Sequence, residues 1–81
     1  MKVRLLLFAV LRDITGKSEA ELSLRDGTSA ADVWQTLRSQ YPRLASYNHP
    51  PLVAVNETYA KADTLLRDGD ELAFIPPVAG G

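Results

Sequence analysis

The sequence SAADVWQTLRSQYP, residues 29–42, contains the only convincing helical pattern in this chain. Ser29 and Asp32 are spaced like a capping box, in which each side chain accepts a hydrogen bond from the other residue's backbone N–H. Apolar residues then recur three and four positions apart, which is typical of one helix face. They are Ala30, Val33, Trp34, Leu37 and Tyr41. We therefore predict a helix that begins after Thr28 or Ser29 and ends at Pro42, with its tryptophan in the core.

On the N-terminal side of this helix, two stretches alternate with the period of two that predicts a strand. Residues 2–11 form the first predicted strand and residues 19–24 the second. A turn at residues 15–17 joins them, and Asp26-Gly27 ends the second strand. We therefore expect an N-terminal hairpin in front of the helix.

On the C-terminal side, residues 42–51 are predicted to be a loop, and three further strands follow it. These strands are residues 52–55, 58–60 and 71–75, with turns at Asn56-Glu57 and at residues 67–70. The order strand, strand, helix, strand, short strand, strand indicates an α+β fold. It resembles the β-grasp (ubiquitin-like) fold, with a mixed four-to-five-stranded sheet and one main helix packed across it.

The composition indicates one small globular domain, residues 1–75, followed by a flexible, extended tail, residues 76–81, that ends in Gly-Gly. The chain has 81 residues, of which 46% are hydrophobic and 23% are charged, and this length can bury one small core. The net charge of −1, without a basic stripe, gives no support for nucleic-acid binding. Without cysteine, the chain cannot hold a disulfide, an iron–sulfur cluster or a thiolate nucleophile.

A short apolar run at residues 5–11 follows Lys2 and Arg4 and superficially resembles a signal peptide. The run is at the lower length limit for such a peptide, is closed by Arg12-Asp13 and lacks a cleavage pattern. It is also too short to span a bilayer. We therefore expect a cytoplasmic protein without membrane contact, in which this run is a buried strand.

The sequence offers no convincing side-chain active site. It lacks a glycine-rich phosphate loop, a zinc pattern and a plausible Ser/His/Asp order. His49 is the only histidine, so it is far more readily explained as a solvated loop residue than as an isolated acid–base group. Asp68 and Asp70 flank Gly69 in a turn where carboxylates commonly bind backbone N–H groups. We therefore expect no metal and no bound cofactor.

Two predicted strands carry apolar residues on the face that should be exposed. On the outward side of the first and of the last strand, the early positions are charged and the later positions are apolar. If these strands are neighbours, their apolar halves merge into one patch, which the short strand could extend. The residues are Leu6, Phe8, Val10, Tyr59, Ala73 and Ile75. Such a patch usually marks a partner surface; alternatively, the helix or a loop covers it, or a bulge shifts the alternation.

The tail, Pro76-Pro77-Val78-Ala79-Gly80-Gly81, is expected to be extended, because proline fixes its own φ and restricts the residue before it. Its reach is roughly 20 Å at ~3.3 Å per residue. The terminal carboxylate lies on a residue without Cβ, so it could enter a narrow site in a partner protein. The alternative is a terminus that is simply frayed.

Three segments carry a family resemblance: VAVNET at residues 53–58, LRDGDELAF at 66–74 and IPPVAGG at 75–81. The stretch FAVLRD at residues 8–13 fits the same family. The chain resembles the small, sulfur-carrying subunit of molybdopterin synthase, of the MoaD/ThiS-type ubiquitin-like family. The resemblance spans the chain and is weakest at residues 39–51.

The resemblance implies a sulfur carrier in molybdenum cofactor biosynthesis that works at Gly81. An E1-like adenylating enzyme would consume ATP to convert the terminal carboxylate, a poor electrophile, to an acyl-adenylate. Sulfur from a donor such as a cysteine desulfurase or a rhodanese-like protein would displace AMP and leave a thiocarboxylate. In the large catalytic subunit, this group would transfer sulfur to cyclic pyranopterin monophosphate, and two transfers create the dithiolene of molybdopterin.

The resemblance also implies residue roles and an assembly. Gly81 would be the carrier, and Gly80, Ala79, Val78, Pro77 and Pro76 would thread the tail into the partner. The docking residues would be Phe8, Tyr59, Ile75, Leu6 and Ala73. Catalytic side chains would belong to the large subunit of a heterotetramer, so that this chain is the non-catalytic sulfur donor of a sulfurtransferase.

Three alternatives remain at this point. The first is a β-grasp sulfur carrier that serves thiamine synthesis or tRNA thiolation. The second is a ubiquitin-like binding module whose terminus is chemically inert. The third, a small enzyme that uses His49 or the Asp68/Asp70 turn, has the least support from the residues.

Overall fold

The computed structural model describes residues 1–46 and 51–76, and the structural statements below concern these residues. The elements in chain order are β1 (Lys2–Leu7), α1 (Ala9–Thr15), β2 (Glu19–Ser23), α2 (Ala30–Gln40), the 3-10 helix η1 (Pro42–Ser46), β3 (Leu52–Val55), β4 (Thr58–Ala60) and β5 (Glu71–Ile75). The strands form one five-stranded sheet in the order β2-β1-β5-β3-β4. The central pair β1–β5 is parallel and the other pairs are antiparallel, so the sheet is mixed as predicted.

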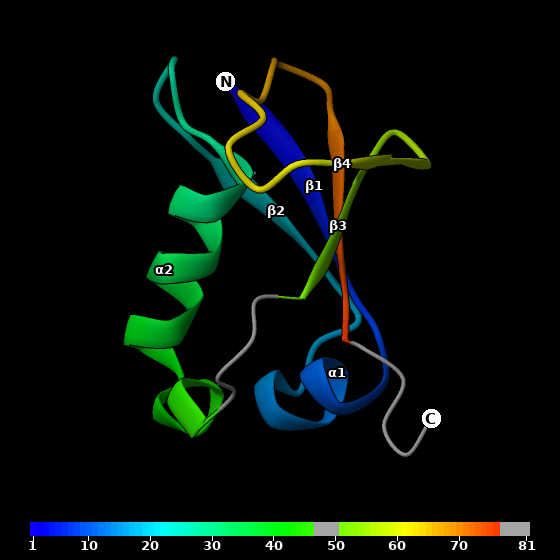
Figure 1. Cartoon of the computed structure of the whole chain (residues 1–81). Helices are drawn as coiled ribbons and strands as arrows, with labels where there is room; N and C mark the ends of the chain where they lie inside the picture. The colour runs from blue at the N-terminus through cyan, green and yellow to red at the C-terminus, as the bar shows by residue number, and fades with distance from the viewer. Residues whose placement is uncertain (47–50, 77–81) are drawn as a thin grey trace.

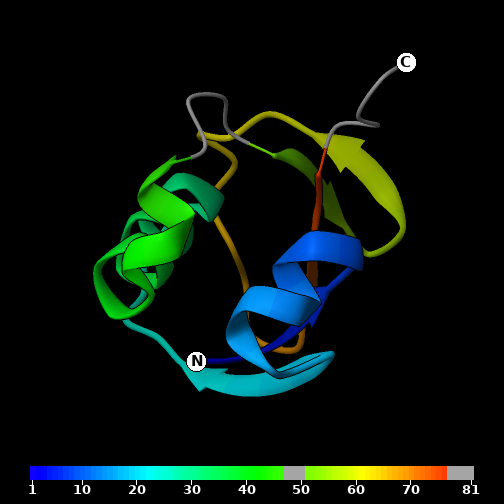
Figure 2. The ribbon, with the colours of Figure 1, turned by 90° about the horizontal axis from the view of Figure 1, so that it is seen from below.

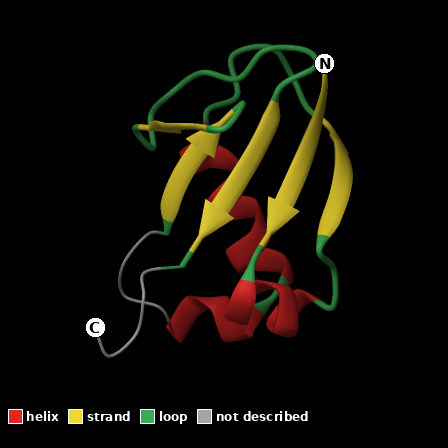
Figure 3. Cartoon of the chain, turned by 90° about the vertical axis from the view of Figure 1, so that its right-hand side faces the viewer, coloured by secondary structure: helices red, strands yellow, loops and turns green. Residues whose placement is uncertain are grey.

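Helix α2 lies along one face of this sheet, and α1 lies at the lower end of the strands (Figure 1; Figure 3). In Figure 3 the strands are in front and α2 lies behind them, so the viewer looks onto the face that the described helices leave uncovered. We call this the open face. One covered and one open face is the arrangement expected of an α+β fold with a single helical layer.

Helix α2 confirms the pattern at residues 29–42. Ser29 is its N-cap, and the Asp32 backbone N–H donates to Ser29 Oγ at 3.1 Å. In return, the Ser29 backbone N–H donates to Asp32 Oδ2 at 2.9 Å, which completes the predicted capping box. The helix ends at Gln40, with Tyr41 as its C-cap residue. The local capping signal is supported by a distant segment, because the Ala30 and Ala31 N–H groups donate to the carbonyls of Thr64 and Ala62 at 3.0 and 2.7 Å.

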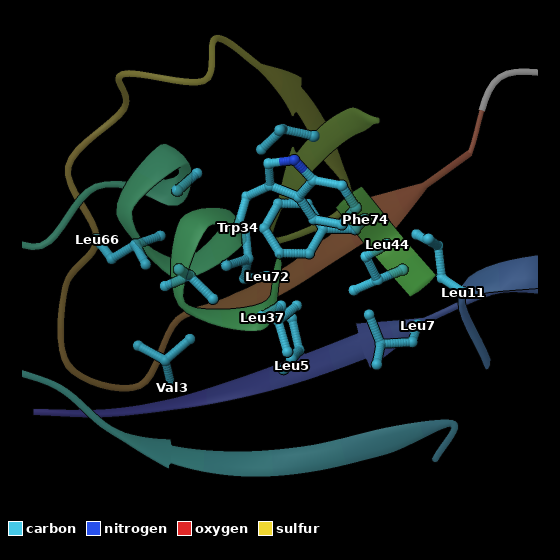
Figure 4. Packing of buried hydrophobic residues seen from close by; sticks show 13 residues of the cluster. Val3, Leu5, Leu7, Leu11, Trp34, Leu37, Leu44, Leu66, Leu72 and Phe74 are labelled. Carbon is cyan, nitrogen blue, oxygen red and sulfur yellow. The ribbon is translucent and has the colours of Figure 1, made fainter. Parts of the chain in front are cut away.

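The core lies between α2 and the inner face of the sheet (Figure 4). Trp34 is 6% exposed and packs edge-on against Phe74 of β5, with ring centroids 5.3 Å apart. This confirms Trp34 as a core residue. The inner sides of β1 and β5 supply most of the sheet's share of the core: Val3, Leu5, Leu7, Leu72 and Phe74.

The prediction that the first strand continues to residue 11 is wrong. Strand β1 ends at Leu7, and Phe8 is the N-cap of helix α1, which Gly16 closes in the left-handed conformation with φ 75°. The cause is that a continuous apolar run has no clear period, so it fits a buried strand and a helix equally well. In the helix, Leu11 is buried at 1% exposure. Figure 2, which views the molecule from below, shows α1 in front of the strands.

The predicted loop at residues 42–51 also needs a correction. Residues Pro42–Ser46 form η1, and its Leu44 is fully buried. Proline is well suited to the first position of a helical turn, because the N–H that it lacks has no partner there. Pro42 therefore ends α2 and starts a new turn that places another leucine in the core.

The turn at residues 67–70 is bound to two other segments, through the backbone of Lys2 and the side chain of Asn56. Asp68 Oδ1 accepts a hydrogen bond from the Lys2 N–H at 2.6 Å. Asp70 accepts from the Arg67 N–H at 2.8 Å and from Asn56 Nδ2 at 2.9 Å. Both carboxylates are therefore engaged in holding the turn, as expected from their positions beside a glycine.

Within the described part of the chain, no helix has the length and apolar character needed to cross a membrane.

Candidate protein-docking surface

A row of four paired residues crosses the open face from β1 to β4. Leu6 is paired with Ala73, Ala73 with Ala54, and Ala54 with Tyr59. Residues directly opposite one another in paired strands project to the same face. The row thus brings together residues from four strands, of which β1 is distant in sequence from the other three.

The row lies in a hollow because its middle residues are small. Ala54 and Ala73 are 7% and 8% exposed and form the floor, whereas Tyr59 at the end of the row is 73% exposed. Phe8, just beyond β1, is 45% exposed. The hollow has a volume of about 320 Å³ and is lined by Leu6, Phe8, Ala54, Glu57, Tyr59, Glu71, Ala73 and Ile75.

We call the apolar members of this lining the apolar patch: Leu6, Phe8, Ala54, Tyr59, Ala73 and Ile75. All five docking residues named from the sequence belong to it. Val10 does not, because it lies on α1 and packs against the core. Residues of the described helices do not line the hollow, since α2 packs on the other face of the sheet.

Three members of the lining were not named as docking residues from the sequence: Ala54, Glu57 and Glu71. Ala54 lies within Leu52–Val55, an unbroken apolar strand, so its alternation cannot tell which residues face outward. Glu57 lies in the turn after that strand and lines the hollow beside Tyr59. Only the register of β3 against β5 places these residues next to the patch.

The other end of the open face is charged. Lys2 Nζ lies 3.2 Å from Glu21 Oε1, and Arg4 Nη1 lies 3.8 Å from Glu71 Oε2. Because Arg4 is paired with Glu71 across β1 and β5, this band is two residues along from Leu6 and Ala73. The open face is therefore divided along the strands into a charged end and an apolar end.

The apolar end is where the last strand finishes. Strand β5 starts at Glu71, at the charged end, and finishes at Ile75, which lines the hollow. Pro76 follows directly. The predicted threading residues 77–80 and the carrier Gly81 lie outside the described residues, as does His49. Among residues 1–46 and 51–76, no group of three acidic or histidine side chains could hold a metal ion.

Comparisons with known proteins show which family this sequence is similar to. The model of the ThiS family matches residues 5–81. The molybdopterin synthase sulfur carrier subunit of Mycobacterium tuberculosis is 38% identical, over 100% of this chain and 99% of that protein. A solved structure of a putative molybdopterin converting factor, subunit 1, from Pyrococcus furiosus has a TM-score of 0.82 and 27% identity, over 95% of this chain and 98% of that one.

A third similar protein was solved as part of a complex. It belongs to the protein–protein complex of subunits 1 and 2 of the molybdopterin-converting factor from Helicobacter pylori. The matched chain has a TM-score of 0.65 and 22% identity, with 100% of both chains covered. At this identity the likeness concerns the fold alone.

Proposed function

This chain belongs to the ThiS family, and from that premise we propose that it is the sulfur carrier subunit of molybdopterin synthase in molybdenum cofactor biosynthesis. It acts as a small, non-catalytic subunit. The observation that carries this proposal is the full-length likeness to a sulfur carrier subunit, together with an apolar patch at the end of β5 from which the tail departs.

The working group in this proposal is the terminal carboxylate of Gly81. Adenylation by an E1-like enzyme joins the carboxylate to the AMP of ATP and releases pyrophosphate. The bound AMP is then a good leaving group on the carbonyl carbon. The terminal sulfur of a persulfide on the donor protein displaces AMP and forms an acyl disulfide. A second thiol then cleaves the S–S bond, is itself oxidised to a disulfide, and leaves a thiocarboxylate, a good nucleophile at neutral pH. The large subunit then uses it to transfer sulfur to cyclic pyranopterin monophosphate.

The apolar patch is proposed as the docking surface for the large subunit. Phe8 and Tyr59 are its most exposed members, and burial of large aromatic side chains supplies much of the binding energy of protein interfaces. Ala54 and Ala73 leave the hollow between them for a side chain of the partner. In this proposal, Pro76, Pro77, Val78, Ala79 and Gly80 thread the tail into the large subunit.

The partners follow from the same chemistry. They are the large catalytic subunit, an E1-like adenylating enzyme and a sulfur donor such as a cysteine desulfurase or rhodanese-like protein. The proposed assembly with the large subunit is a heterotetramer, and the proposed site of action is the cytoplasm. The full-length likeness to a molybdopterin synthase sulfur carrier subunit supports the first of these partners.

Charging of the tail tests the proposal. We expect that the chain, incubated with the adenylating enzyme, ATP and a sulfur donor, exchanges one oxygen for sulfur, as measured by intact mass spectrometry. A variant that lacks Gly81 should keep its melting temperature and remain uncharged. If wild-type chain gains no sulfur while a known carrier does so in the same mixture, the proposal is wrong.

A further inference from the structure

The β3–β4 turn holds a glutamate in a backbone conformation that favours glycine. Asn56 and Glu57 are the two central residues of this hairpin, with φ values of 52° and 69°. A two-residue turn with both central φ values positive is of type I′, in which Asn-Gly is strongly preferred. A glutamate at the second position is strained, because its Cβ crowds the backbone there.

Asn56 has an evident structural reason for its position, and Glu57 has none. Asn56 Nδ2 donates to Asp70 Oδ1 at 2.9 Å, and Asn56 Oδ1 accepts from the Glu71 N–H at 2.9 Å. Glu57, in contrast, makes no side-chain hydrogen bond or ion pair with any residue in the ranges 1–46 and 51–76. Its side chain is exposed.

The position of Glu57 relates it to the docking surface. It lines the hollow together with Tyr59 and Glu71, at the charged end of the apolar patch. Of the two carboxylates in this lining, that of Glu71 already faces Arg4 at 3.8 Å. The carboxylate of Glu57 is therefore the one that a partner seated on the patch would meet without a counter-ion.

A partner that covers the patch would remove water from this carboxylate. A carboxylate that loses water without gaining a counter-ion or hydrogen bonds is strongly unfavourable. We propose that Glu57 is a specificity-determining contact, whose carboxylate pairs with a lysine or arginine of the large subunit at the charged end of the apolar patch. This inference rests on the proposed function, which supplies the large subunit as the partner.

Such a pair would fix the orientation of the partner. Strand β5 runs from Glu71 to Ile75, and its four residue steps span about 13 Å. The partner would thus be held at two separated points, with the tail at one end of the patch and the ion pair at the other. An acidic group at the corresponding place on a wrong partner would be repelled by Glu57.

The test measures binding of the purified large subunit to wild-type chain and to three variants at low and high ionic strength. Glu57→Gln keeps the shape and backbone preference of the side chain but removes its charge. We expect Glu57→Gln to weaken binding about two- to fivefold at low salt and to make the affinity less dependent on salt. Asp63→Asn is the control for the loss of a carboxylate charge, because Asp63 is exposed and lies outside the hollow, between two residues whose carbonyls accept hydrogen bonds from the start of α2.

Glu57→Gly distinguishes the effect of backbone strain at this position from the effect of the lost ion pair with the large subunit. Glycine relieves the positive φ, so we expect the melting temperature to rise by a few degrees while binding weakens as in Glu57→Gln. Unchanged affinity and salt dependence in both Glu57 variants would overturn the inference alone, provided that wild-type chain binds. Failure of the wild-type chain to bind the large subunit would overturn the proposed function and this inference with it.

Discussion

Phe8 combines two roles that depend on different parts of one residue. Its backbone is extended, with φ −120° and ψ 155°, and ends β1 as the N-cap of α1. Its side chain is 45% exposed at the edge of the hollow. The backbone role tolerates many residue types, so a change of side chain should act mainly on binding.

We therefore expect Phe8→Asp to weaken binding of the large subunit by about tenfold or more, because burial of an aromatic side chain is lost and a charge must be desolvated. The melting temperature should change little. Leu65→Asp is the control, since Leu65 is 63% exposed and lies outside the hollow. Binding measured by calorimetry that falls equally in both variants would contradict the assignment. A large loss of stability in Phe8→Asp alone would instead place Phe8 in the core.

Asn56 is expected to stabilise the fold rather than the interface. Asn56→Ala removes hydrogen bonds to Asp70 and Glu71 and places a less tolerant residue at φ 52°. We expect a loss of about 1–3 kcal/mol in the free energy of unfolding, measured by urea denaturation. Asn56→Gly should lose less, because glycine accepts this φ. Wild-type stability in Asn56→Ala would show that these bonds contribute nothing.

At the scale of elements, α2 depends on a local signal. Ser29→Ala removes the side-chain acceptor of the capping box and should reduce stability by about 1 kcal/mol, which lowers the melting temperature by about 4–8 °C. Ser39→Ala in the same helix is the control, because Ser39 is exposed and its hydroxyl only donates to the Gln35 carbonyl at 3.2 Å. Equal melting temperatures for the two variants would contradict the role of the cap.

The elements that could be predicted are those in which several signals agree. Helix α2 has a cap, a stripe and a terminating proline, and β5 has a turn with a glycine before it and a proline after it. Helix α1 could not be predicted, because residues 5–11 are all apolar. Such a run does not show where the period of a strand gives way to the period of a helix. Gly16 was the available signal, since glycine commonly closes a helix in the left-handed conformation.

Residues of the candidate site could be predicted only on strands whose sequence shows which side chains face outward. Leu6 and Ile75 follow charged residues on their strands, which marks them as members of the outward side. Ala54 and Glu57 could not be identified, because neither alternation nor composition tells how β3 is aligned with β5. Register between distant strands is a property of the folded sheet, and a short apolar strand does not specify it locally.

At the scale of the whole molecule, the two faces of the sheet have separate tasks. The inner face and α2 form the core around Trp34 and Phe74, and the open face carries the apolar patch. Because the parallel pair β1–β5 is central, the first and last strands lie side by side, and Leu6 and Ala73 meet. The topology thus places the proposed docking surface beside Ile75, directly before the predicted tail.

The central claim is that this chain donates sulfur from Gly81 within molybdopterin synthase. The most direct measurement supplies the charged chain and cyclic pyranopterin monophosphate to the purified large subunit and identifies the product. We predict molybdopterin, in proportion to the thiocarboxylate consumed, and none when Gly81 is deleted. Consumption of the thiocarboxylate only by a thiazole-forming or tRNA-thiolating enzyme, with no molybdopterin formed, would contradict the account.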